Sequence, residues 1–179
     1  MKTSLLALAA AIGLFGAVAL RPGPAPSGPA DVAKVLDQFH DAASRADENE
    51  YFGLFAEDGV FLGTDASERW SKEQFRAYAK PYFAQGRGWT YLPRPNGRFV
   101  TISKDGTVAW FDEILDNAKF GECRGSGVLV LGDKGWKIAQ YNLTVPVPND
   151  LMPKVAEMIK ATAKARAHAK PEDAKDAKK

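Results

Sequence analysis

The sequence predicts an α+β domain in which helices precede a curved antiparallel sheet. Helical spacing of apolar residues is confined to the first part of the chain, and from about residue 89 the spacing changes to the alternation typical of strands. The longest strand patterns cover 108–115, 122–131 and 136–145, and short turns join them. This order predicts three N-terminal helices packed over the concave face of a cone-like sheet.

The first two helices are indicated by their apolar spacing and their capping residues. Asp31 is the expected cap of the first helix, whose apolar positions recur at helical spacing through residue 46. Asp47 with Glu50 forms a capping-box pattern and predicts a second, short helix, which stops at Asp58-Gly59.

The third helix carries the same capping signature. Ser71 followed by Gln74 predicts a helix over 72–84. Pro81 falls inside this range and is expected to bend or interrupt the helix, because proline lacks the backbone N–H that a helix interior needs.

Shorter strands are expected around the third helix. Residues 60–62 form a brief apolar run, and residues 98–103 form a firmer strand. The segment 89–92 is a candidate edge strand limited by Pro93 and Pro95, since proline is confined to sheet edges and strand ends.

Both ends of the chain differ from the central domain, which we place at 31–149. Residues 1–19 have the layout of a secretory signal peptide, with Lys2 before a short apolar run that small residues close. Residues 20–30 form a Pro/Gly-rich linker, and 150–179 form a Lys/Ala-rich tail expected to run from helix into disorder. The protein is therefore expected to be periplasmic or secreted, with an uncleaved membrane anchor as the alternative.

Charge is unevenly distributed between the domain and the tail. Residues 31–150 hold 14 basic and 18 acidic side chains, a balance of −4, whereas residues 151–179 hold 8 basic and 4 acidic ones, a balance of +4. Basic and aromatic residues are not interleaved across the domain, so we expect no nucleic-acid binding. Membrane contact is expected only through the N-terminus or the basic tail.

Metal and cofactor binding are not expected. The domain has one cysteine, Cys123, and one histidine, His40, without the spacing of a metal site, and no phosphate-binding glycine loop or nucleotide fingerprint is present. Cys123 is interpreted as a buried core residue, and an exported chain with one cysteine has no internal disulfide. His40 is a candidate catalytic residue, although a solvated or hydrogen-bonded helix histidine is the favoured interpretation.

Three segments resemble the SnoaL-like families of the nuclear transport factor 2-like superfamily. They are FAEDGVFLGTD at 55–65 with Glu68 and Trp70 after it, the strand RGSGVLV from Arg124, and the strand at 136–149. The resemblance implies a cone-shaped cavity between the sheet and the helices, and a homodimer formed through the outer face of the sheet. It does not imply one activity, because the superfamily includes isomerases, hydrolases, cyclases and binding domains.

Strand alternation selects the residues expected in this cavity. Gln140 and Asn142 share one face of the last strand, and Tyr141 faces the other side unless a bulge exchanges the two faces. Relatives commonly have a histidine where Asn142 stands, and asparagine cannot transfer a proton near neutral pH. The candidate ligand-binding residues are Trp70, Trp110, Asp112, Arg124, Gln140 and Asn142.

Two interpretations of Asp112 and Arg124 remain open. In the functional interpretation, Asp112 acts as a base or Arg124 holds an anionic group of a ligand, because the forked donors of arginine match a carboxylate. The favoured alternative is a mostly buried structural ion pair. Glu68 and Trp70 are likewise open between a structural role, in which Glu68 caps backbone amides, and contact with a ligand.

The functional hypotheses differ in whether the cavity binds a ligand or catalyses a reaction. The preferred one is a non-enzymatic domain that binds a small, partly apolar molecule or acts as a dimeric accessory domain. The alternative is a cofactor-independent isomerase or hydrolase, which would need a buried, unpaired carboxylate with a raised pKa. A third hypothesis makes the basic tail a tether to a membrane or partner.

Overall fold

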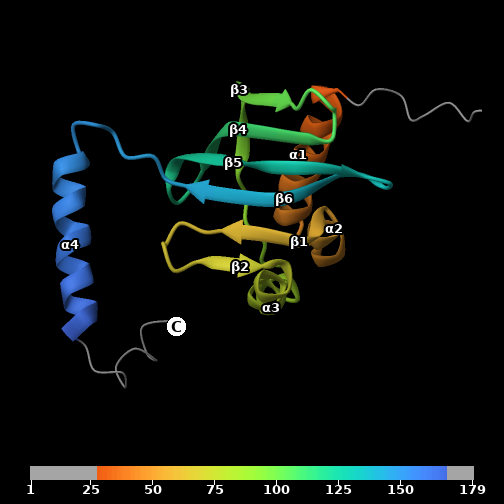
Figure 1. The fold of residues 1–179 in the computed structure, drawn as a ribbon. Coiled ribbons are helices and arrows are strands. Elements are labelled where there is room, and N and C mark those ends of the chain that lie inside the picture. The colour runs from red at the N-terminus through yellow and green to blue at the C-terminus, as the bar shows by residue number, and fades with distance from the viewer. Residues whose placement is uncertain (1–27, 169–179) are drawn as a thin grey trace, which may run out of the picture.

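The computed structural model describes residues 28–168 (Figure 1). The segment predicted as a signal peptide, most of the predicted linker, and the tail from residue 169 lie outside the described residues. None of the helices within 28–168 has the length and apolarity needed to cross a bilayer.

One six-stranded sheet forms the centre of the domain, in the order β2–β1–β6–β5–β4–β3. The strands are β1 Phe55–Leu62, β2 Arg69–Ser71, β3 Leu92–Ile102, β4 Val108–Asn117, β5 Gly121–Gly132 and β6 Gly135–Thr144. Every neighbouring pair is antiparallel except β1 and β6, which are parallel. The expected all-antiparallel sheet is corrected here to a mixed one, because most of the domain lies between β1 and β6, so no hairpin joins them.

Three helices cover one face of this sheet, as predicted (Figure 1). They are α1 Pro29–Ser44, α2 Glu48–Gly53 and α3 Lys72–Phe83. The first contacts β3 and β6, whereas the third contacts β1 and β2. The helix α4, Met152–His168, stands apart from the sheet at the side of the loop between β1 and β2 (Figure 1).

The first helix begins two residues before the predicted cap. The Gly28 N–H donates to the Asp31 carboxylate at 2.9 Å, so Asp31 stabilises the helix from inside its first turn. Pro29 occupies the first helical position, where its missing N–H costs no intrahelical bond.

The second helix begins as predicted but ends earlier. Asp47 accepts a hydrogen bond from the Glu50 N–H at 2.9 Å, which confirms the cap. The helix stops at Gly53 rather than at Asp58-Gly59, because Phe55 already pairs with Ile138 of β6 and starts β1.

The third strand differs most from its prediction. It runs as one edge strand from Leu92 through Pro93 and Pro95 to Ile102, with a register shift between Pro93 and Arg98. At the sheet edge a proline loses no ladder bond on its free side, so the prolines do not end the strand. The segment before Leu92, expected to be a strand, is irregular.

A register shift in β6 decides which of its residues face the helices. Trp136 and Ile138 are buried on the inner face, and after the shift the buried residues are Tyr141 and Leu143. The bulge considered for this strand is therefore present. Opposite these residues, β4 buries Ala109, Phe111, Glu113 and Leu115, so a carboxylate lies among apolar inner-face positions.

Candidate functional site

An aromatic hollow opens between α3, the segment after it, and the turn between β4 and β5. Its volume is about 410 Å³, within the range of small-molecule sites. Most of its lining is aromatic, and the rings come from Trp70, Phe75, Tyr78, Tyr82, Trp89, Tyr91 and Phe120.

Local sequence explains how three of these rings share a wall. Phe75, Tyr78 and Tyr82 follow each other at steps of three and four along α3, which places them on one helix face. The helix start is fixed by a capping box, in which the Ser71 N–H donates to Gln74 Oε1 at 2.9 Å and the Gln74 N–H donates to Ser71 Oγ at 3.3 Å. Pro81 is accommodated inside the helix.

Several ring planes in this region are nearly parallel. The planes of Trp70 and Phe75 differ by 4° with centroids 5.5 Å apart, and those of Trp70 and Tyr78 differ by 19° at 5.0 Å. Phe61 lies 4.0 Å from Phe75 at 17°. Rings aligned in this way favour a further flat ring that stacks beside them in the same orientation.

Two charged residues also line the hollow. Glu68 closes the loop between β1 and β2, because its Oε2 accepts from the Asp65 N–H at 3.2 Å and its carbonyl accepts from the Gly63 N–H at 2.8 Å. Glu68 thus has the backbone-capping role considered for it. The Arg87 guanidinium lies over the Tyr82 ring, 5.8 Å from its centroid.

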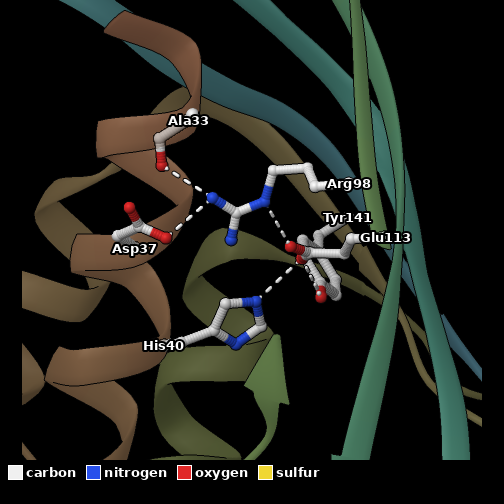
Figure 2. A network of polar contacts seen from close by, with 6 residues as sticks. All are labelled: Ala33, Asp37, His40, Arg98, Glu113 and Tyr141. Atoms are coloured by element: carbon white, nitrogen blue, oxygen red, sulfur yellow. Dashed lines mark hydrogen bonds and ion pairs between the residues drawn. The ribbon is translucent and has the colours of Figure 1, made fainter. Parts of the chain in front are cut away.

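Deeper in the domain, a buried polar network surrounds Glu113 (Figure 2). Glu113 is 0 % exposed, and its Oε1 accepts hydrogen bonds from His40 Nε2 at 2.7 Å and from the Tyr141 hydroxyl at 3.0 Å. Its Oε2 accepts from Arg98 Nε at 2.7 Å. Arg98 in turn donates to Asp37 of α1 at 2.7 Å, so the network joins α1 to β3, β4 and β6.

The pKa values in this network follow from burial and charge. Burial alone raises the pKa of the Glu113 carboxyl, but the hydrogen bonds from His40 and Arg98 and the charge of Arg98 outweigh it, so the pKa lies below its usual value. Burial raises the pKa of the Tyr141 hydroxyl well above its usual range, and the Glu113 charge adds to this shift. Glu113 is therefore ionised and Tyr141 protonated at neutral pH.

His40 is oriented by Glu113. An ionised carboxylate only accepts hydrogen bonds, so His40 Nε2 must carry the shared proton. The other ring nitrogen, Nδ1, forms no hydrogen bond with a described residue. His40 and Tyr141 also line a void of about 20 Å³ that shares Trp89 and Tyr91 with the aromatic hollow.

The predicted site residues fall on opposite faces of the sheet. Trp70 lines the aromatic hollow. The other five lie together on the outer face, away from the helices, because each is on the face opposite the buried positions of its strand: Trp110, Asp112, Arg124, Gln140 and Asn142. Their expected position in the cavity is corrected accordingly.

Asp112 and Arg124 do not form the expected ion pair. In the ladder Asp112 lies opposite Ser126, whereas Arg124 lies opposite Ile114 and Thr144. Both side chains are exposed on the outer face. Neither a buried pair nor a cavity base is formed by these two residues.

Glu113, Arg98 and Tyr141 were missed as site residues, although the sequence held a signal for two of them. Glu113 alternates with Phe111 and Leu115, so any assignment of those two residues to the core also buries the carboxylate. Gly125 lies opposite Glu113, and a Cβ atom there would collide with the Tyr141 hydroxyl. A glycine inside a strand is the usual sign of such a close approach.

Within residues 28–168, no group of three or more histidine, cysteine or acidic side chains is placed to hold a metal ion. The polar network could hold or transfer a proton at His40, and the aromatic hollow could hold a flat apolar group.

Comparison with known proteins identifies the family. The model of the SnoaL-like domain matches residues 32–148. A search of curated proteins finds no match.

Solved structures show the same fold. A domain of unknown function with a cystatin-like fold from Nostoc punctiforme aligns with a TM-score of 0.59 at 16% identity, covering 79% of this chain and 93% of that one. A nuclear transport factor 2-like protein of unknown function from Pseudomonas putida gives 0.55 at 12%, covering 67% and 87%. A protein of unknown function from Pectobacterium atrosepticum gives 0.54 at 18%, covering 66% and 90%. At these identities the likeness concerns the fold.

Proposed function

The chain belongs to the SnoaL-like domain family, and from this premise we propose that its domain binds a small molecule with a flat apolar ring in the aromatic hollow. The observation that carries the proposal is the set of nearly parallel rings at Trp70, Phe75 and Tyr78 beside an open volume of about 410 Å³. Offset-stacked aromatic pairs contribute about 0.5–1.5 kcal/mol beyond the burial of their area.

Substitution of one of two tryptophans tests the ring-binding proposal. Trp70 lines the hollow, whereas Trp110 is 49% exposed on the outer face of the sheet. In ligand-observed NMR titrations with indole, Trp70→Leu should weaken binding about tenfold, which corresponds to about 1.4 kcal/mol. Trp110→Leu, the matched control, should leave the dissociation constant unchanged. Equal effects of the two substitutions would show that indole does not bind in the aromatic hollow.

Acid/base catalysis by a cofactor-independent isomerase or hydrolase is a second candidate function, and His40 supports it. The Nε2–H of His40 is held by Glu113, so Nδ1 is the ring nitrogen that could accept a proton, and His40 lines the void next to the hollow. Neither Glu113 nor Asp112 is the buried, unpaired carboxylate with a raised pKa that this role needs. The pKa of Glu113 is lowered, and Asp112 is exposed. Among ring-containing esters and ketones, any turnover should vanish in His40→Gln and persist in Asp112→Asn.

A homodimer formed through the outer face is also part of the proposed function. Two large apolar side chains, Phe99 and Trp110, are 64% and 49% exposed there on adjacent strands. Apolar side chains gathered on one sheet face favour association with a second copy. Sedimentation velocity should give a dimer that Trp110→Asp converts to a monomer, whereas a monomeric unmodified protein would contradict the proposal.

Export to the periplasm or the medium is proposed from the layout of residues 1–19. An uncleaved anchor or contact of the basic tail with a membrane surface would retain the protein in the membrane fraction. Cell fractionation, with N-terminal sequencing of the mature protein, distinguishes these outcomes.

A further inference from the structure

We propose that the ligand of the aromatic hollow carries a carboxylate next to its ring, and that the Arg87 guanidinium binds this carboxylate. The inference rests on the proposed function, because it assigns the chemical class of ligand for the same hollow. Arg87 is the one basic side chain among the described residues that line it.

The backbone of Arg87 is fixed by the end of α3. The Arg87 N–H donates to the Tyr82 carbonyl at 3.0 Å, and the Gly86 N–H donates to the Phe83 carbonyl at 2.9 Å. Gly86 has a φ of +67°, so these two hydrogen bonds form a Schellman motif that turns the chain back over the helix end. This turn sets the starting point of the Arg87 side chain at the rim of the hollow.

The head group of Arg87 is also positioned. Its guanidinium carbon lies over the Tyr82 ring, 5.8 Å from the ring centroid, and this cation–π contact holds the head group beside the hollow. The arginines Arg45, Arg76, Arg94 and Arg98 each form an ion pair with a carboxylate. Arg87 forms no ion pair with a described residue, so its donors are available to a ligand.

The fork of an arginine matches a carboxylate in two parallel hydrogen bonds. A ring stacked against the lining would bring such a carboxylate to the rim, where the aromatic walls exclude part of the water. The ring and the carboxylate would then be recognised by different residues, Trp70 and Arg87.

Glu68, across the same hollow, is the competing determinant. An unpaired carboxylate there would favour a ligand ammonium, but Glu68 Oε2 already accepts the Asp65 N–H and closes the loop between β1 and β2. We therefore assign the charge preference of the hollow to Arg87.

Three probes that share the indole ring system but differ in charge test the assignment. They are the anion indole-3-acetate, the neutral indole-3-acetamide and the cation tryptamine. By isothermal titration calorimetry at low salt, the carboxylate should bind about tenfold tighter than the amide, and tryptamine should bind most weakly. Arg87→Gln should bring indole-3-acetate to the affinity of the amide, and Arg87→Lys should restore only part of the difference. Lys80→Gln, which removes an exposed charge of α3 outside the hollow, should change none of the three affinities.

The remaining outcomes separate this inference from the proposed function. Tightest binding of tryptamine would overturn the inference and assign the preference to Glu68. Equal binding of all three probes would also overturn it, while leaving ring binding intact. Failure of the three probes and of indole itself would contradict both the inference and the proposed function.

Discussion

Two arginines on β3 contact carboxylates at nearly the same distance, one pair inside the domain and the other at its surface. Arg98 contacts Glu113 at 2.7 Å with side-chain exposures of 13% and 0%, whereas Arg94 contacts Asp116 at 2.6 Å with exposures of 41% and 50%. Contact length therefore does not distinguish the pairs. Burial does, because low local dielectric strengthens the inner pair and also makes loss of either partner costly.

The register shift of β3 explains how one strand supplies both pairs. Arg94 and Arg98 are an even number of residues apart, so a regular strand would place them on the same face. The shift between Pro93 and Arg98 exchanges the faces, and Arg98 reaches the inner network while Arg94 remains with Asp116 and Glu122.

The largest effect is expected from breaking the inner pair. Glu113→Ala should lower the free energy of unfolding by about 3–5 kcal/mol, because it leaves the buried Arg98 without its main partner. The measurement is equilibrium unfolding in urea. Asp116→Ala, the matched change in the outer pair, should leave the unfolding midpoint within experimental error because water replaces the lost contact. Similar losses from both substitutions would show that burial does not separate the pairs.

A smaller effect is expected from crowding the inner network without removing a charge. Gly125→Ala should cost about 1–3 kcal/mol, since the added methyl group collides with the Tyr141 hydroxyl and lies 3.0 Å from Glu113 Oε1. Gly132→Ala is the control, because a Cβ there meets nothing within 4 Å. Thermal unfolding provides the comparison.

A double-mutant cycle identifies the colliding group. Tyr141→Phe alone removes a hydrogen bond to Glu113, and in the Gly125→Ala background it also removes the closest clashing atom, while the ring carbon Cζ stays 2.8 Å from the added methyl group. The double variant should therefore be more stable than the sum of the single effects predicts. Strict additivity would mean that Gly125 acts through something other than the hydroxyl.

The inner pair should also make stability depend on acid pH. The pKa of folded Glu113 lies below its ordinary value of 4.5, so its contribution is fully present above about pH 4.5 and is lost as pH falls through the folded pKa. Glu113 faces His40, Arg98 and Tyr141, and Asp37 acts through Arg98. The measurement is the urea midpoint between pH 6 and pH 3, a range that brackets the ordinary glutamate pKa by about 1.5 units on each side. The midpoint should fall less steeply with pH in Glu113→Gln than in the unmodified protein. An unchanged slope would assign the acid sensitivity to other carboxylates.

Sequence periodicity was sufficient for the parts of the fold that local residues determine. Capping residues fixed the starts of α2 and α3, and alternation identified β4, β5 and β6. α2 ends earlier than predicted, because the parallel pairing of Phe55 with Ile138 ends the helix and no local residue encodes that contact.

The candidate site was less accessible from sequence because it depends on which strand face is buried. The apolar neighbours Phe111 and Leu115 are enough to place Glu113 inside, whereas the face predicted to line the cavity, which carries Asp112, is the outer one. Arg98 could not be placed by alternation, since the β3 register shift intervenes. The aromatic hollow joins rings from α3, β2 and two connecting segments, so only tertiary structure brings it together.

The smallest expected effect is a difference in salt sensitivity between the two arginines. The screening length of water falls from about 10 Å at 0.1 M salt to about 3 Å at 1 M, and exposed pairs are screened far more than buried ones. Any loss of stability in Arg94→Gln should therefore disappear when sodium chloride is raised to about 1 M, a concentration at which little surface attraction remains. The loss in Arg98→Gln should persist, since its partner Glu113 is out of contact with solvent. Urea midpoints of both variants at low and high salt provide the measurement. If salt removed both losses equally, Arg98 would be solvated in the same way as Arg94, and burial would not separate the two pairs.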